Sequence, residues 1–341
     1  MIESAIHTTV EIIVSLIPVF AFLLALILLD SYKLITFRSI LIAILFGSVI
    51  AIICLVAESW FTAELNINDK TNARYVAPVI EEICKASYLI WMIKKMKVGF
   101  MVDAAIYGFA IGAGFAFVEN AHFLHIKPQI NLFVLIIRGL GTAVMHGGTT
   151  AIFGIITRNL AEQHHSLSLY LFLPGLVTAI VIHSFFNHFI LSPVAMTILQ
   201  LILLPLLIYT AFKRSEQSLR NWMEVGLNTD VQLLEYISTG KVATTRIGKY
   251  LQTLKKNFPG EIVADMLCYI RLYVELAIRA KGVLLMQETG FKVTLERDIQ
   301  EKFQELKYLE NSMGKTGKRA LNPVFQISAR DLWQLYMLNT K

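Results

Sequence analysis

The sequence predicts an all-α membrane protein, a polytopic bundle of about seven transmembrane helices followed by a helical cytoplasmic C-terminal domain. Of its 341 residues, 55% are hydrophobic and only 16% are charged, and the mean hydropathy is +0.59. Soluble domains carry about 25% charged residues. Most of the charge follows residue 212. We therefore expect a transmembrane domain over 1–212 and a cytoplasmic helical domain over 213–341.

A helix that crosses a bilayer needs about 20 mostly apolar residues. Seven segments of the sequence have this length and apolar character. They cover roughly residues 10–29, 38–57, 77–95, 103–125, 131–157, 168–191 and 194–212. Backbone polar groups in lipid must be paired within their own segment, so each is expected to form a helix.

The basic residues between these segments predict the orientation. One side carries Lys33, Arg38, Lys94, Lys95, Lys97, Arg158, Lys213 and Arg214, and the other carries Lys70, Arg74 and Lys127. Basic loops are retained in the cytoplasm, so we expect the N-terminus outside and the C-terminal domain in the cytoplasm. This asymmetry also accounts for the net charge of +6, and we expect a lipid bilayer and no nucleic acid as partner.

Charged and polar residues recur inside the third and fourth segments. Glu81 and Glu82 precede Lys85 by four and three residues, so all three share one face of a helix. In the next segment Glu119 and Asn120 follow a glycine-rich stretch that allows close helix packing. A charge at the bilayer centre costs about 2.5–3.5 kcal/mol on insertion scales, so these residues need partners or a function.

The fifth and sixth segments repeat this pattern. Arg138 and His146 are about two helical turns apart, and His183 and Asn187 about one turn apart. Each feature alone has a structural explanation: an ion pair of Glu81 with Lys85, a snorkelling arginine, or a buried core histidine. Four successive helices with polar stripes cannot all face lipid, so we expect the stripes to converge in one cavity.

The residue types in that cavity suit hydrolysis. A buried glutamate beside a second glutamate can deprotonate water, and histidine and asparagine can donate to the oxyanion of a tetrahedral intermediate. Lys85 or Arg138 can keep another glutamate ionised and oriented, with Asn120 in support. The HExxH motif of zinc proteases is absent from the sequence.

Four motifs in this order resemble the PrsW family, a branch of the superfamily of CAAX prenyl endopeptidases and bacteriocin-processing enzymes. They are Glu-Glu-x-x-Lys at 81–85, Phe-x-x-x-Glu-Asn at 115–120, Arg138 with His146, and His-x-x-x-Asn at 183–187. The resemblance covers roughly residues 75–190. It implies an intramembrane endopeptidase that cleaves membrane-anchored regulators such as anti-sigma factors, and we expect an integral protein of a bacterial cytoplasmic membrane.

The motif positions also imply residue roles. The base would be Glu81, with Glu82 bonding Lys85 or Arg138, although the two glutamates can exchange roles. His183 and Asn187 would form the oxyanion site. Glu119 stands where CAAX-type relatives have histidine, which argues against direct CAAX processing.

Cofactor and function leave alternatives open. Hydrolysis without a cofactor is favoured, but a zinc-dependent metalloprotease is the alternative, with His146, His183 and Glu119 as ligands. A proton-coupled transporter would use the same buried residues, and a receptor or scaffold would use mainly the C-terminal domain. Within the protease hypothesis, we expect residues 213–341 to bind a cytoplasmic regulator.

Overall fold

The computed structural model describes residues 23–24, 27–28, 35–126, 132–164, 167–188, 190–288, 291, 298–321, 323–324 and 338. Every regular element within these residues is a helix, which confirms the all-α prediction. The chain divides into two compact units, residues 1–215 and 216–341. The assignment of a protease domain to 1–212 and a cytoplasmic domain to 213–341 stays a prediction.

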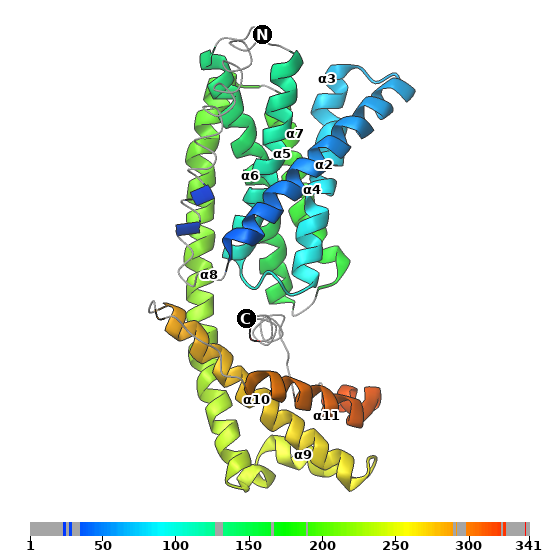
Figure 1. Cartoon of the computed structure of the whole chain (residues 1–341), viewed down its shortest axis with the longest axis vertical. Helices are drawn as coiled ribbons and strands as arrows, with labels where there is room; N and C mark the ends of the chain where they lie inside the picture. Colours follow the sequence, from blue (N-terminus) through cyan, green and yellow to red (C-terminus); the bar gives the residue numbers. More distant parts are fainter. Residues whose placement is uncertain are drawn as a thin grey trace. The chain divides into compact units, whose positions relative to one another are not determined.

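The first unit is a bundle built around α5. In chain order its elements are α2 (Phe37–Glu64), α3 (Asp69–Thr71), the π-helix η1 (Asn72–Val76), α4 (Ala77–Lys94), α5 (Met101–Ile126), α6 (Leu132–Gln163), the 3₁₀ turn η2 (Leu169–Phe172), α7 (Leu173–Asn187) and the first half of α8 (Pro193–Ser238). α5 packs most extensively against α6 and α2, and α2 crosses it obliquely (Figure 1). α4 contacts α2, α5, α6 and α7, so charged residues on α4 can reach several helices.

Five described helices are long and apolar enough to cross a membrane: 37–64, 101–126, 136–163, 169–187 and 194–238. They correspond to five of the predicted segments, and the chain is an integral membrane protein. The predicted segment 77–95 is helix α4, whose four charged side chains lower its apolar character. The predicted segment 10–29 lies almost entirely outside the described residues, so the count of seven stays a prediction.

Local sequence explains where the helices that carry the site begin. α4 follows directly on η1, and Pro78 lies in its first turn, where its missing N–H leaves no bond unmade. α5 begins next to Asp103, whose carboxylate accepts the backbone N–H groups of Gly99 and Phe100 at 2.9 and 3.1 Å. The Asp103 contacts fix the turn between α4 and α5.

Arg158 corrects one detail of the sequence analysis, which placed it in a loop after the fifth segment. α6 continues to Gln163, and Arg158 lies inside it with only 1% of its surface exposed. Its Nε donates to the carbonyl of Gly99 at 2.8 Å. The guanidinium thus links α6 to the turn between α4 and α5. Arg158 is therefore not one of the basic loop residues that predict the orientation.

Two glycines of α5 allow the close approach of α6. A Cβ atom at Gly112 would lie 2.2 Å from the carbonyl oxygen of His146, and one at Gly108 would lie 2.5 Å from that of Thr150. No side chain fits at such distances, so the backbones meet directly, as small-xxx-small pairs allow in membranes. The site residue His146 therefore sits at the closest contact of the two helices.

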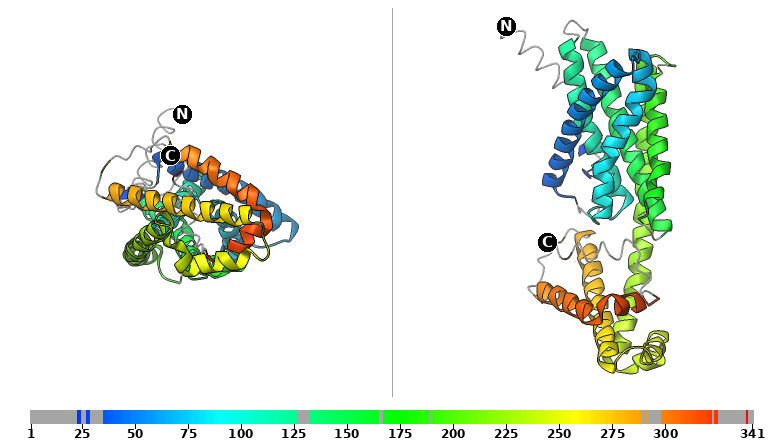
Figure 2. Two further views of the ribbon diagram at one scale, coloured as in Figure 1. Left: turned by 90° about the horizontal axis from the view of Figure 1, so that it is seen from below. Right: turned by 90° about the vertical axis from the view of Figure 1, so that its right-hand side faces the viewer.

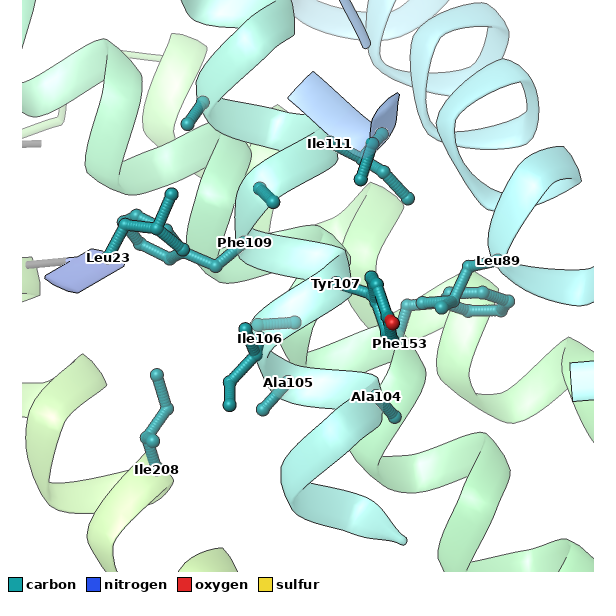
Figure 3. Close-up of a cluster of buried hydrophobic side chains, with 14 of the residues drawn as sticks. Leu23, Leu89, Ala104, Ala105, Ile106, Tyr107, Phe109, Ile111, Phe153 and Ile208 are labelled. Atoms are coloured by element: carbon teal, nitrogen blue, oxygen red, sulfur yellow. The ribbon is translucent and has the colours of Figure 1, made fainter. Parts of the chain in front are cut away.

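Apolar side chains surround α5 on its other sides. Leu23, Leu89, Phe109, Phe153 and Ile208 all belong to one buried cluster, and Figure 3 shows them gathered around the helix. This core comes from helices far apart in the chain, since it joins residues of α4, α5, α6 and α8. It encloses α5 and leaves the polar residues to meet elsewhere in the bundle.

The second unit contains the rest of α8, the 3₁₀ turn η3 (Lys241–Thr244), α9 (Arg246–Leu254), α10 (Gly260–Glu288) and α11 (Asp298–Leu321), drawn in yellow to orange-red from α9 onward in Figure 2. α10 packs against α11 and α9, and Arg279 of α10 binds Asp298 of α11 at 2.9 Å.

We expect Gly112→Ala to destabilise the purified protein by about 1–3 kcal/mol, because the added methyl group overpacks the α5–α6 contact. Thermal unfolding in detergent measures the effect. The matched control is Gly282→Ala, since Gly282 is also inside a helix but nothing lies within 4 Å of a Cβ there. An unchanged melting temperature for Gly112→Ala would contradict the close approach.

Candidate active site

Four helices bring their polar residues together in the first unit. Glu81, Glu82 and Lys85 come from α4, His146 from α6 and His183 from α7, and all five are buried. Glu119 of α5 joins them from a more open side. The convergence that the sequence predicts is therefore present, and it joins residues up to 102 positions apart, from Glu81 to His183.

Glu82 is the most heavily bonded group of the cluster. Its Oε1 accepts hydrogen bonds from Lys85 Nζ at 2.7 Å, from His183 Nδ1 at 2.8 Å and from the Thr149 hydroxyl at 3.1 Å. Lys85 is fully buried and Glu82 is only 2% exposed. Three donors on one oxygen stabilise a carboxylate, and this one is an anchor between α4, α6 and α7.

Each histidine has one ring nitrogen bound to a carboxylate. His146 Nε2 lies 2.6 Å from Glu119 Oε2, and His183 Nδ1 lies 2.8 Å from Glu82 Oε1. A carboxylate accepts, so these nitrogens carry the protons in the neutral rings. The opposite nitrogens, His146 Nδ1 and His183 Nε2, then present lone pairs.

Both lone pairs face Glu81. Its Oε2 lies 3.7 Å from His146 Nδ1 and 3.9 Å from His183 Nε2, and it is buried with no hydrogen-bond partner among the described residues. Three acceptor atoms thus meet in the interior, and among them His146 Nδ1 has a donor, Lys85 Nζ at 2.8 Å, whereas the Glu81 oxygen has none among the described residues. Such an arrangement is costly unless a proton or a cation joins the group.

The open side of the cluster is formed by Glu119 and Arg138, whose side chains are 27% and 30% exposed. Arg138 donates to Glu119 Oε1 at 3.4 Å and to Asn120 Oδ1 at 3.3 Å, and it stacks on the ring of Phe123. Asn120 in turn donates to the carbonyl of Gly139. Arg138 and Asn120 therefore hold Glu119 in place on the more exposed side of the cluster.

Asn187, for which the resemblance implies a place in the oxyanion site, bonds the backbone of η1. Its amide donates to the carbonyl of Ala73 in η1 at 2.7 Å, and the neighbouring hydroxyl of Ser184 donates to the carbonyl of Arg74 at 2.5 Å. Two carbonyls of the π-helix η1 thus accept side-chain hydrogen bonds from α7. The end of α7 is thereby fastened to the start of α4, which positions His183 against Glu81.

Two further residues belong to the site although the sequence analysis did not name them. The Thr149 hydroxyl bonds Glu82, as given above, and it follows His146 by three residues on α6. Glu58 of α2 interacts with Glu81 and Asn72. The sequence did not single out Glu58 because it lies one residue beyond the predicted segment 38–57, where a charged residue needs no functional explanation.

The cluster also contains a set of atoms suited to a metal ion. Ligand atoms of Glu81, His146 and His183 all lie within 4.8 Å of one another. Two imidazoles and one carboxylate are a ligand set of catalytic zinc sites, which keep a fourth position open. Glu119, the carboxylate expected in such a set, instead holds the far nitrogen of His146, as outer carboxylates of zinc sites do.

Lys85 competes for one of these ligand atoms. Its Nζ lies 2.8 Å from His146 Nδ1, the same nitrogen that faces Glu81. A metal ion at this nitrogen would require Lys85 to give up that bond while keeping Glu82. The buried oxygen of Glu81 without a partner and the two prepared imidazoles otherwise fit a divalent ion.

Comparison with known proteins places the chain in a family. The model of the PrsW family intramembrane metalloprotease matches residues 35–210, a stretch that contains every residue of the cluster. Searches of curated proteins and of solved structures give no significant match. Because the family match covers more than half of the sequence, the chain belongs to the PrsW family of intramembrane proteases.

Proposed function

We propose that this chain cleaves peptide bonds of membrane-anchored proteins, and that Glu81, His146 and His183 form the centre that activates the attacking water. One observation carries the proposal. Three acceptor atoms from α4, α6 and α7 converge within 4.8 Å in the protein interior, and the Glu81 oxygen among them is unpaired. A packing cluster would not retain such an arrangement, because an unpaired buried acceptor is destabilising.

The charges around the centre support the same residue. Lys85 pairs with Glu82, and Arg138 pairs with Glu119. Glu81 has the two imidazoles at 3.7 and 3.9 Å and Glu58 as neighbours, and among the described residues it forms no ion pair with a lysine or arginine. It can therefore accept a proton from water or ligate a divalent ion without breaking an ion pair.

The ligand set and the family together favour a metal ion at this centre, and we propose zinc held by Glu81, His146 and His183. This differs from the sequence-based preference for no cofactor. When bound, zinc supplies Lewis-acid polarisation of the carbonyl and a lowered pKa of a bound water. Glu119 and Glu82 fix the ring orientation and tautomer of the two histidines.

Lys85 is the oxyanion donor that the geometry favours. An ammonium group has three N–H donors, and Glu82 and His146 accept two of them. Asn187, expected in this role, already donates its amide to Ala73. Because Lys85 lies within the dry core of the cluster, a third hydrogen bond from it to a developing oxyanion would be strong.

The contact between Lys85 and His146 also supports a second mechanism without metal. Glu81 would take a proton from water as the hydroxyl oxygen bonds to the carbonyl carbon. The tetrahedral intermediate would then collapse, the C–N bond would break, and the same proton would pass from Glu81 to the leaving amine. Both mechanisms use the same three residues and differ in the occupant of the centre.

Removing the centre tests the protease proposal. We expect Glu81→Gln and His183→Ala each to lower cleavage of a membrane-anchored reporter by at least about 10²–10⁴-fold, the usual contribution of an acid–base group. Glu64→Gln, which changes an exposed glutamate at the end of α2, is the control and should keep full activity. If both site variants cleave like the wild type, the assignment of the centre fails.

Metal analysis tests the occupant. We expect purified protein to contain about one zinc per chain, and a chelator to remove both the metal and the activity. His188→Ala serves as control, because His188 bonds Tyr75 and the backbone of α7 outside the cluster. Active protein that contains no zinc and is insensitive to chelation would leave only the mechanism in which Glu81 acts alone.

Glu119 and Glu81 have different roles in this proposal, and zinc affinity separates them. We expect Glu119→Gln to weaken zinc binding about 10–100-fold, the usual effect of losing an outer hydrogen-bond partner. Glu81→Gln should weaken it more, since a ligand is lost. Equilibrium titration of metal-free protein measures both, and the reverse order would make Glu119 the ligand.

A further inference from the structure

An apolar pocket of about 300 Å³ lies between α6, α7 and α8 within the first unit. Its walls include Ile182 and Phe185 of α7 and Leu199 and Leu203 of α8. The Leu203 and Leu199 side chains are 47% and 39% exposed on the apolar outer surface of the bundle. The pocket is therefore open toward the region where lipid or another apolar chain lies.

The pocket adjoins the proposed catalytic centre. Thr149 lines it, and the hydroxyl of the same residue donates to Glu82 at 3.1 Å. Met145 and Ile182 also line it, and each directly precedes one of the two histidines in the sequence. An apolar group in this pocket would therefore contact the immediate sequence neighbours of His146 and His183.

A buried side-chain oxygen interrupts the apolar wall on the α8 side. Gln200 of α8 lines the pocket, and its Oε1 is buried with no hydrogen-bond partner among the described residues. A buried carbonyl oxygen without a donor is costly, so the occupant of the pocket is expected to bring one. An acyl chain has no donor, whereas a polypeptide backbone has one at nearly every residue.

We infer that this pocket binds the apolar side chains of the substrate next to the cleaved bond, and that Gln200 accepts a backbone N–H of the same segment. The inference rests on the proposed function and adds the substrate class: a membrane-embedded segment with large apolar residues at the cleavage point. A volume of about 300 Å³ is at the lower limit of ligand pockets, so it accommodates side chains and not a whole helix.

Hydrolysis inside a membrane requires local unwinding of the substrate helix, and the pocket would stabilise the unwound turn. A peptide bond within a helix is shielded, and its N–H is bonded to a carbonyl four residues earlier. Opening one turn of the substrate frees N–H groups that lipid cannot satisfy. Gln200 offers an acceptor for one of them, at the same place where the freed side chains find space.

Filling the pocket tests side-chain selection. Synthetic single-span peptides that differ only in leucine or alanine at the mapped cleavage positions are incubated with wild type and with Leu203→Trp. We expect Leu203→Trp to lower cleavage of the leucine peptide by at least about tenfold relative to the alanine peptide, the scale of discrimination by a hydrophobic pocket. Leu206→Trp, an exposed α8 position outside the pocket, should leave the ratio unchanged. An unchanged ratio in Leu203→Trp overturns the inference.

The acceptor has its own test. Gln200→Met keeps the length of the side chain and removes the amide oxygen. We expect it to lower kcat/KM about 5–10-fold for both peptides, which corresponds to one ordinary hydrogen bond. Activity equal to the wild type on both peptides would remove Gln200 from substrate binding.

A binding experiment separates failure of this inference from failure of the proposed function. The photoreactive residue p-benzoylphenylalanine replaces Leu203, or Leu206 as control, in the Glu81→Gln background, and a biotin-labelled leucine peptide is added in lipid vesicles. We expect a crosslink at 203 that excess unlabelled peptide suppresses, and no suppressible crosslink at 206. If this result accompanies a wild type that cleaves none of the peptides, the pocket binds peptide but the proposed function is wrong. If crosslinks at 203 reach only lipid, a second copy or the chain's own N-terminal segment, the pocket inference is wrong.

Discussion

Charged groups inside a bilayer must find partners within the protein, and this constraint organises the first unit. Lys85 is fully buried, yet it contacts Glu82 and His146, and Glu82 contacts His183. One lysine and one glutamate of α4 therefore connect three helices. Breaking this network would leave uncompensated buried charge, which costs more than the loss of an ordinary contact.

The same network sets the orientation of the two histidine rings. Each carboxylate that is satisfied holds a histidine by its outer nitrogen, so the inner nitrogens face each other across Glu81. Neutral imidazoles in this orientation are acceptors, as metal binding or proton uptake requires. The ion pairs of Glu82 and Glu119 lie around the centre, and the Glu81 oxygen without a hydrogen-bond partner lies inside it.

Much of this arrangement follows from the sequence, because membrane insertion makes polar residues conspicuous. The residues Glu81, Glu82, His146 and His183 were identifiable by the cost of burying them, and the structure brings them together. Pairing partners were harder to predict. Helix spacing showed which residues share a face, but it did not show that Glu119 would bond His146 while Asn187 would turn to Ala73.

Residues without an evident cost were missed for the same reason. Thr149 is a common residue in apolar helices, and its role appears only from its contact with Glu82. Arg158 was misplaced because an arginine near the end of a segment resembles a loop residue until the helix is seen to continue to Gln163. The sequence shows which residues are costly to bury, and the structure is needed to show which contacts offset that cost.

Recognition of a substrate in this setting cannot rely on the hydrophobic effect. An apolar side chain gains little when it moves from lipid into an apolar pocket, since both surroundings are alike. Shape and hydrogen bonding must then provide the preference, and the pocket between α6, α7 and α8 offers both: a limited volume and the unpaired oxygen of Gln200. A segment that stays helical has no free N–H for this oxygen, so the site would favour substrate turns that unwind readily. Selection by the ease of unwinding, more than by apolar character, is what a buried catalytic centre in lipid requires.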